Sequence, residues 1–252
     1  MHLKGKVTIV TGGNKGIGKG IGLRLAKEGS NVVIAARDTV AAKIVLNELK
    51  KVGCDAMFVR TDVSEKKDVD RMIKKTIEKF GKIDFLINNA AIVIDSPFLE
   101  LTEEIWDKTL NVNLKGYFLC AQAAAKEMVK RKIHGKIINI TSVQGLTVWT
   151  SISHAPYEVS KAGIIMLTKQ LAYELAQYNI TVNAVGPGPT ETEILEPWTK
   201  NPDKLNSIIK NIPLGRIAKP SDVAGAVNYL LSSDADYLTG ITIFVDGGRL
   251  TW

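Results

Sequence analysis

Short apolar segments rich in β-branched residues alternate along this chain with longer segments that have a helical pattern. The predicted strands cover 6–11, 31–36, 56–61, 84–89, 135–141, 180–185 and 241–246. The predicted helices between the first six strands cover 16–28, 39–52, 65–80, 102–131 and 156–177. Strands that are apolar throughout must be covered on both faces, which is typical of parallel sheets. We therefore predict an α/β fold in which a doubly wound, seven-stranded parallel sheet carries helices on both faces.

The chain contains no internal repeat, low-complexity tract or linker, so we expect a single domain over 1–252. One connection between predicted strands is long, at 187–240, and prolines break it into pieces. Insertions after the carboxyl end of a parallel strand are where such sheets place loops that cover a ligand. We predict that the insertion at about 187–220 is a substrate lid.

Charge and cysteine content argue against several classes of function. The formal charge is +7, but the lysines are spread over the polar faces of predicted helices, which indicates solvation and no nucleic-acid partner. Cys54 and Cys120 have neither metal-type nor disulfide spacing, so we expect no metal and a reducing, cytoplasmic location. The N-terminus has no signal-peptide pattern and no apolar stretch of 18 residues occurs, so no membrane partner is expected.

A glycine-rich turn, "TGGNKGIGKGIG", follows the first predicted strand and opens the first predicted helix. Gly12, Gly16 and Gly18 have the spacing GxxxGxG. Glycines at such a turn let backbone N–H groups approach a pyrophosphate at a helix N-terminus. Polar segments also follow the ends of later strands, namely "TDV" (61–63), "NNAA" (88–91), "TSV" (141–143) and "GPGPTET" (186–192). In a parallel sheet these ends share one edge, so we predict a ligand site there.

The segment "YEVSK" places Tyr157 and Lys161 one turn apart on a predicted helix. Pro156 suits the first turn of that helix, because the missing N–H has no helical partner there. Below the pair, Ile164, Thr168, Leu171 and Leu175 continue one inward-facing stripe. A buried ammonium is costly without a partner. From the helix alone, Lys161 either has such a partner or extends to water from the helix end.

These motifs together resemble the short-chain dehydrogenase/reductase family in its simple form of about 250 residues. The matching segments are "TGGNKGIG", "NNAA", "NVNLKG", "TSV", "YEVSK" and "GPGPTET", and the resemblance extends to the closing "VDGG". It implies a Rossmann fold and an NAD(P)-dependent oxidoreductase that interconverts a carbonyl and a secondary alcohol. The chain is also similar to the 3-oxoacyl-carrier-protein reductases and the glucose and alcohol dehydrogenases of the family.

Two departures from the family pattern affect local structure. Ala91 stands where the family usually has glycine. Ser142 and Tyr157 are 15 positions apart, which is more than is usual in relatives and changes the loop over the substrate.

The resemblance implies a role for each residue of the site. Tyr157 is the acid and base, Lys161 its activator, and Ser142 binds the carbonyl oxygen. Asn113 belongs to a proton relay, although from the residues alone it could be a satisfied core amide. A neighbouring ammonium and a positive nicotinamide ring are both expected to lower the phenol pKa from its ordinary value of about 10.

The resemblance also implies a set of cofactor-binding residues. Asp62 could instead cap the next turn, and Thr190 and Thr192 could be turn residues. The implied set is Gly12, Asn14, Lys15, Gly16, Ile17, Gly18, Arg37, Asp62, Val63, Asn89, Ala90, Tyr157, Lys161, Pro187, Gly188, Thr190 and Thr192.

The end of the second strand, "VVIAARD", predicts the choice of cofactor. A dinucleotide fold commonly has an acid there, which binds the ribose and repels a 2′-phosphate. By resemblance that position is Ala36, followed by Arg37, while Lys15 stands in the glycine-rich turn. Two cations favour NADP(H), although NAD(H) is possible. We expect Asp38 to cap the helix at 39–52; the alternative is that it binds the ribose hydroxyls.

Substrate identity stays open at the level of sequence. The amide of Gln144 favours a sugar or polyol, whereas the apolar loop at 145–156 suits a hydrophobic ketone. The basic surface would suit an acidic acyl carrier. Trp149 and Trp198 either line the substrate pocket or only pack against other apolar side chains. His154 has no carboxylate or cysteine at triad or metal spacing and is interpreted as a loop residue or pocket wall.

Two other classes of function share motifs with this chain. Sugar-nucleotide epimerases share YxxxK but are longer and carry TGxxGxxG, which this chain lacks. A dinucleotide-sensing regulator would not need Ser142, Tyr157 and Lys161 together. By resemblance, the helices at 102–131 and 156–177 pair with symmetry mates in a homotetramer, with Ala172 and Ala176 available for close packing.

Overall fold

A computed structural model describes residues 2–149 and 153–251. Its strands form one sheet in the order β3-β2-β1-β4-β5-β6-β7, and every pairing is parallel. The strands are β1 Val7–Thr11, β2 Asn31–Ala36, β3 Ala56–Arg60, β4 Phe85–Asn88, β5 Lys136–Ile140, β6 Thr181–Pro187 and β7 Thr242–Val245. This sheet confirms the predicted fold, because the order reverses between β1 and β4 as in a doubly wound dinucleotide fold.

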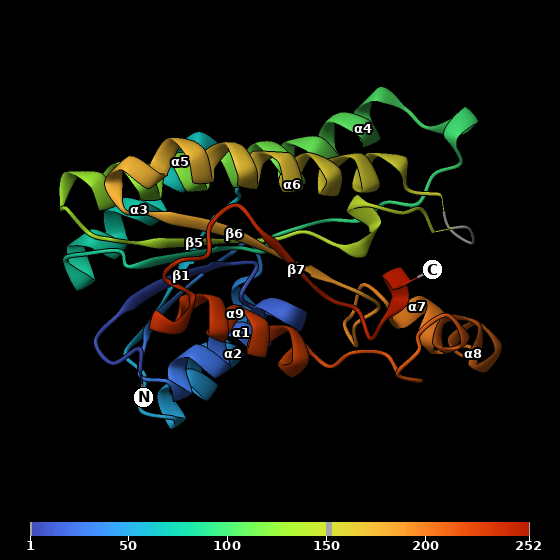
Figure 1. Cartoon of the computed structure of the whole chain (residues 1–252), viewed down its shortest axis with the longest axis horizontal. Helices are drawn as coiled ribbons and strands as arrows, with labels where there is room; N and C mark the ends of the chain where they lie inside the picture. Colours follow the sequence, from blue (N-terminus) through green and yellow to red (C-terminus); the bar gives the residue numbers. More distant parts are fainter. Residues whose placement is uncertain (1, 150–152, 252) are drawn as a thin grey trace.

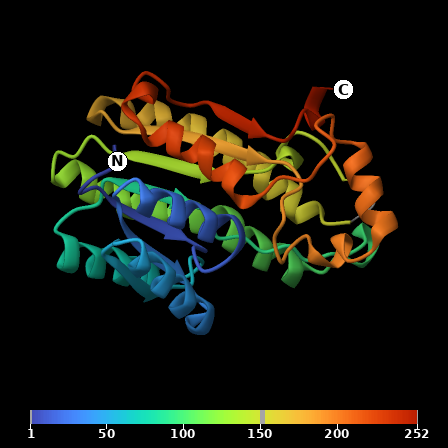
Figure 2. The same cartoon turned by 90° about the horizontal axis from the view of Figure 1, so that it is seen from below.

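Helices cover both faces of the sheet (Figure 1 and Figure 2). One layer contains α1 Gly16–Lys27, α2 Thr39–Lys51 and α9 Pro220–Leu231; the other contains α3 Lys66–Phe80, α5 Gly116–Lys130 and α6 Ala155–Leu175. Successive strand residues point to opposite faces, so Ile9 packs into the core under α3 and α5 while Val10 packs into the core under α1. Both residues are fully buried, which explains why successive positions of a strand can both be apolar.

The predicted helix at 102–131 is divided by a π-helical turn. α4 (Glu103–Leu110) is followed by the π turn Asn111–Lys115, and α5 begins at Gly116. Gly116 lies so close to β3's following loop that an added Cβ would be 2.7 Å from a methyl carbon of Val63. π turns are rare and occur frequently at functional sites. This turn contains Asn113, one of the predicted site residues.

The connection between β6 and α9 folds into two short helices that the sequence analysis did not predict. They are α7 Glu196–Thr199 and α8 Pro202–Lys210. Proline occupies the first turn of α7, α8 and α9, where its missing N–H is harmless. The two helices lie beyond the carboxyl ends of the strands (Figure 1). Leu195, Ile208 and Ile212 form a separate apolar cluster there, with Trp149, Trp198 and Ile217 packed against it.

Short 3₁₀ segments complete the described chain. They cover Phe98–Glu100, Val143–Gly145, Ala176–Tyr178, Ser233–Ala235 and Arg249–Thr251. Among the described residues, we find no helix with the length and apolar character needed to cross a bilayer.

Candidate active site

A cavity of about 500 Å³ opens at the carboxyl edge of the sheet. It brings together most of the residues predicted for the site. Those that line it are Gly12, Asn14, Lys15, Gly16, Ile17, Arg37, Asp62, Val63, Asn89, Ala90, Ser142, Gln144, Trp149, Tyr157, Lys161, Pro187, Gly188, Thr190 and Thr192. Gly18, Asn113, His154 and Trp198 lie outside this lining.

Several lining residues were missed by the sequence analysis. They include Ile92, Ile194 and Leu195. Each is an apolar residue in the loop after β4 or in the β6–α9 connection. Such residues carry no chemical signal in the sequence, and only the fold brings them to one edge.

The glycine-rich turn forms a backbone cradle at the start of α1. Gly12 has a φ of +63°, and an added Cβ would lie 2.9 Å from the Cα of Ala90. A Cβ on Gly18 would collide with the carbonyl oxygen of Gly12. Because no side chain larger than hydrogen fits, backbone amides can come close to a ligand here. This cradle fits the diphosphate of a dinucleotide.

Asn89, directly after β4, forms hydrogen bonds that hold the glycine-rich turn in place. Its Nδ2 donates to the carbonyl oxygen of Thr11 at 2.9 Å, and its backbone N–H donates to the Thr11 hydroxyl at 2.9 Å. The Asn89 amide therefore holds the loop that a cofactor would meet. In the adjoining loop, Thr190 donates to the Gly188 carbonyl and Thr192 donates to the Thr190 carbonyl, so both threonines also shape their own turn.

The ammonium of Lys161 is buried between two tyrosine rings. Its side chain is among the least exposed of the molecule, and Nζ lies 5.4 Å from the ring centroids of both Tyr117 and Tyr157. Nζ donates to the carbonyl oxygen of Ile140 at 2.8 Å, and the Tyr117 hydroxyl donates to the same oxygen at 3.0 Å. Lys161 therefore faces inward and does not extend to water. Within residues 2–149 and 153–251, Ile140 is the one acceptor that Nζ has, which leaves two ammonium hydrogens for a ligand in the adjoining cavity, and ribose hydroxyls fit that need.

Burial shifts the pKa values of both Lys161 and Tyr157. It lowers the pKa of Lys161 from 10.5 to about 7. It also raises the pKa of Tyr157 to about 12, and a hydrogen bond with Ser142 acts in the opposite direction. The expected lowering of the phenol pKa by Lys161 is thus not seen in the protein alone, because burial raises that pKa and the opposing contribution comes from Ser142.

Ser142 stands directly after β5 and opens the 3₁₀ turn Val143–Gly145. Its hydroxyl accepts from the backbone N–H of Gln144 at 3.2 Å. The preceding Thr141 donates its hydroxyl to the carbonyl oxygen of Lys161 at 2.7 Å. These bonds lock the end of β5 onto the first turns of α6, so Ser142 and Tyr157 meet at the cavity.

Asn113 lies behind the cavity and is fully buried. Its Oδ1 accepts from the backbone N–H of Ile92 at 2.9 Å, and its Nδ2 donates to the Ile92 carbonyl at 2.9 Å and to Ser160 Oγ at 3.3 Å. The side-chain amide thus joins the π turn, the loop after β4 and α6.

Charged groups surround the far end of the cavity, beyond the end of β2. Asp38 accepts from the backbone N–H groups of Val40 and Ala41 at 2.9 and 3.1 Å, which confirms the predicted cap of α2. Arg37 lies 3.8 Å from a carboxylate oxygen of Asp62, and more than half of its side chain is exposed. Exposed pairs of this kind are weak, so Arg37 is free to bind a ligand.

Asp62 also caps its own turn, as the sequence allowed. Its Oδ1 accepts from the backbone N–H and the hydroxyl of Ser64 at 3.0 and 2.6 Å. Lys15, in the glycine-rich turn, is exposed and lines the same cavity as Arg37 and Asp62.

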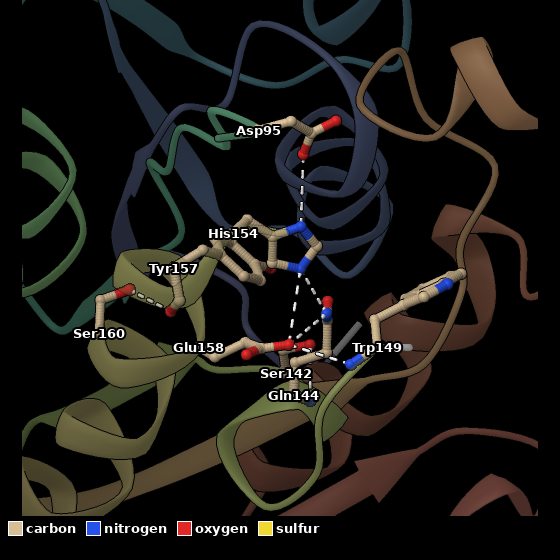
Figure 3. Close-up of polar contacts among 8 residues, drawn as sticks. All are labelled: Asp95, Ser142, Gln144, Trp149, His154, Tyr157, Glu158 and Ser160. Atoms are coloured by element: carbon tan, nitrogen blue, oxygen red, sulfur yellow. Dashed lines mark hydrogen bonds and ion pairs between the residues drawn. The ribbon is translucent and has the colours of Figure 1, made fainter. Parts of the chain in front are cut away.

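His154 lies directly before α6, and the fold buries it beside Tyr157 with two carboxylates near it, which the sequence analysis did not predict (Figure 3). Its ring meets the Tyr157 ring edge-on at 5.4 Å. Nδ1 lies 3.4 Å from Asp95, and Nε2 lies 3.8 Å from Glu158 and 2.5 Å from Gln144 Nε2. Asp95 is 59 residues away in sequence, so no local spacing could have revealed the contact.

Trp149 links the loop after β5 to two other segments. Its ring packs on the apolar cluster of α7 and α8, which also holds Trp198. The guanidinium carbon of Arg249 lies 5.1 Å from the centroid of the Trp149 ring. Trp149 lines the cavity, whereas Trp198 packs within the cluster.

Comparisons with known proteins agree with this geometry. The model of a family described as enoyl-(acyl carrier protein) reductase matches residues 12–249. The chain is 42% identical over 250 residues to a 3-oxoacyl-[acyl-carrier-protein] reductase of Synechocystis sp., and the match covers 98% of each chain.

Solved structures resemble the fold along its whole length. A short-chain type dehydrogenase/reductase from Mycobacterium marinum is 37% identical with a TM-score of 0.95, and the match covers 98% of this chain and 96% of that one. A putative 2-deoxy-D-gluconate 3-dehydrogenase from Agrobacterium tumefaciens, solved with bound NADP, is 35% identical with a TM-score of 0.92. That match covers 99% of this chain and 98% of the other.

The buried ammonium makes stability depend on pH. Because the pKa of Lys161 is about 7 in the fold and near its ordinary 10.5 when unfolded, the unfolded chain holds an extra proton between these values. The free energy of unfolding should therefore rise with pH across this window, by about 4 kcal/mol from this residue. Lys161→Met should lose that rise.

Urea unfolding of the cofactor-free protein near pH 6.5 and near pH 10 measures the effect. Lys169→Met is the matched control, because Lys169 is exposed on the same helix. Groups that titrate in both Lys161→Met and the wild type make the same contribution to the free energy of unfolding, so their contributions cancel in the difference between the two proteins. Equal pH dependence in these two proteins would contradict the prediction.

Proposed function

Because the chain belongs to the short-chain dehydrogenase/reductase family, whose members transfer hydride between a nicotinamide cofactor and a CH–OH or carbonyl group, we propose that it is an NADP(H)-dependent ketone reductase. Tyr157 is the acid that protonates the carbonyl oxygen, Lys161 holds the cofactor ribose, and Ser142 binds the carbonyl oxygen. The same residues serve the reverse oxidation of a secondary alcohol.

The observation that carries this proposal is the buried ammonium of Lys161. A buried cation with one carbonyl partner costs stability and is retained where a ligand completes its hydrogen bonds. The cavity beside it contains a phenol and a serine hydroxyl, the two donors that a developing alkoxide needs.

When bound, the reduced nicotinamide supplies a hydride to the carbonyl carbon. The carbonyl oxygen then gains negative charge, and the Ser142 hydroxyl donates a hydrogen bond to it. The Tyr157 hydroxyl gives its proton to that oxygen. Burial holds the pKa of Tyr157 at about 12, so the phenol is protonated at neutral pH and is ready to act as an acid.

Lys161 and Asn113 support the proton transfer from behind the cavity. An ammonium beside Tyr157 stabilises the phenolate that remains after the proton has left. The Asn113 amide holds the loop after β4 against α6 through Ile92 and Ser160. We propose that this arrangement keeps a path open for reprotonation.

Removal of the Tyr157 hydroxyl should stop catalysis and leave the fold intact. We expect Tyr157→Phe to lower kcat by about two orders of magnitude or more, the range usual for a positioned acid, while cofactor binding is largely kept. The measurement is NADPH oxidation with a panel of ketones, with cofactor binding followed by titration. Tyr173→Phe is the control, because Tyr173 is exposed on the same helix. Turnover near the wild-type value in folded Tyr157→Phe would refute the acid role.

The charges at the far end of the cavity support NADP(H) over NAD(H). Ala36 has no carboxylate to repel a 2′-phosphate, and Arg37 and Lys15 line the cavity on this side. Asp38 is engaged in capping α2. A guanidinium binds phosphate through paired N–H donors, so Arg37 would exchange its weak pair with Asp62 for the cofactor phosphate.

Cofactor preference should reverse when the two charges at the end of β2 are changed. The wild type should have a higher kcat/KM with NADPH than with NADH. Ala36→Asp/Arg37→Leu should prefer NADH, because an acid then binds the ribose hydroxyls and the cation is gone. Steady-state kinetics with both cofactors on one ketone tests this. A wild type that prefers NADH would show that Arg37 and Lys15 do not bind a phosphate.

We also propose that the insertion at about 187–220 closes over the substrate and that the protein assembles as a homotetramer. Thr192 and Leu195 line the cavity, so movement of this segment would change access to it. Apolar side chains that lie exposed on α5 and α6, namely Phe118, Met166 and Val159, support assembly. Ala172, predicted for that surface, is instead buried in the sheet-facing core.

A charge on this surface should dissociate the assembly. Met166→Glu would place a carboxylate among Leu114, Phe118 and Leu167, which line the same shallow groove. We expect a tetrameric mass for the wild type and a lower mass for Met166→Glu by light scattering at micromolar concentration. Val40→Glu, on exposed α2, should leave the mass unchanged. A monomeric wild type would refute the proposed assembly.

A further inference from the structure

Gln144, His154, Asp95 and Glu158 form a chain of polar contacts at the wall of the cavity, called here the Gln144 network (Figure 3). Gln144 Nε2 lies 2.5 Å from His154 Nε2 and 3.4 Å from Glu158 Oε1. His154 Nδ1 lies 3.4 Å from Asp95 Oδ1. Ketone reduction by Tyr157 and Lys161 needs none of these residues, although three of the four side chains are buried or mostly buried.

The two carboxylates favour one arrangement of hydrogens in the network. Glu158 Oε1 accepts as a carboxylate, so the part of Gln144 that faces it is assigned as the –NH₂ group. The same nitrogen faces His154 Nε2, which accepts from it in the neutral ring. The ring proton then lies on Nδ1, where the Asp95 carboxylate accepts it. A rotated amide would bring its oxygen against the carboxylate of Glu158.

The network leaves one group of Gln144 for a ligand. Both hydrogens of its –NH₂ are used, and its Oε1 accepts no hydrogen bond from any residue that the structure describes. Gln144 lines the cavity next to Ser142, whose hydroxyl accepts from the Gln144 backbone N–H. The free group beside the reacting carbonyl is therefore an acceptor.

Other contacts hold the network in this arrangement. Glu158 Oε1 also accepts from the backbone N–H of Trp149 at 3.0 Å, which fixes the carboxylate between loop and helix. The backbone N–H of Ser96 donates to the Ser153 carbonyl at 2.7 Å, which holds the loop with Asp95 beside His154. The amide of Gln144 is thus fixed by neighbours on both sides, as a specificity group must be.

We propose that the Gln144 network selects ketones that carry a hydroxyl group within two carbons of the carbonyl, as in keto-sugars and oxidised polyols. The proposal rests on the ketone reduction proposed above. The substrate hydroxyl donates to Gln144 Oε1, while Asp95, His154 and Glu158 are positioning residues. A ketone without that donor leaves a desolvated acceptor unpaired, which a site built for hydrogen bonding rejects.

Matched ketones test the proposal. Acetoin, 2-butanone and 2,3-butanedione share four carbons but offer a donor, no polar group and an acceptor, respectively; 2-hydroxyacetophenone and acetophenone form a larger pair. The readout is the ratio of kcat/KM values within a set, compared between wild type and variants. The intrinsic reactivity of each ketone cancels in that comparison.

We expect the ratio of kcat/KM for the hydroxy ketone to kcat/KM for the unsubstituted ketone to be about tenfold or more higher in the wild type than in Gln144→Leu. His154→Phe, which keeps a ring beside Tyr157, should lower the same ratio by about tenfold. In His154→Phe the freed amide can also turn its N–H toward a second carbonyl. The ratio of 2,3-butanedione to 2-butanone should therefore rise in His154→Phe and not in Gln144→Leu. General loosening of the site would instead lower kcat/KM for all the ketones by a similar factor.

Asp107→Ala is the control for Asp95→Ala, since both aspartates are exposed but Asp107 lies on α4 away from the network. Asp95→Ala should lower the hydroxy-ketone preference by about threefold, and Asp107→Ala should not change it. Reduction of all ketones with equal ratios in wild type, His154→Phe and Gln144→Leu would overturn this proposal alone. No reduction of any ketone with either cofactor would overturn the proposed function and this inference with it.

Discussion

The carbonyl oxygen of Ile140 accepts hydrogen bonds from two side chains at once. Lys161 Nζ on α6 and the Tyr117 hydroxyl on α5 both donate to it. Ile140 is the last residue of β5. A sheet and two helices therefore meet at one acceptor, and the distance between Tyr157 and Ser142 depends on that junction. The Thr141 hydroxyl adds a second bond between the same strand end and the backbone of α6.

The sequence predicts the scaffold well because the scaffold depends on local pattern. The seven strands differ from prediction by a residue or two at their ends, and Pro156 lies in the first turn of α6 as expected. The catalytic candidates Tyr157 and Lys161 share one helix, so helical periodicity alone brings them together. Prediction fails where a tertiary contact reshapes the local pattern, as at the π turn that carries Asn113.

The substrate side of the site was less predictable for a physical reason. Its partners come from separate strand-end loops, and no periodicity connects Asp95 to His154. Glu158 is four residues from His154 in sequence, whereas the fold supplies the second carboxylate, Asp95, through the loop after β4. The expected effect of Lys161 on the Tyr157 pKa was similarly incomplete, because burial depends on packing that the sequence does not state.

The ring of Trp149 lies under the guanidinium of Arg249 and against the apolar cluster of α7 and α8. Trp198 lies on α7 and belongs to the same cluster, so this cluster contains two of the four tryptophans of the chain. Indole emission responds to a nearby cation and to local solvent. The molecule therefore carries its own optical reporter, in which a displacement of α7 and α8 changes fluorescence without an attached dye.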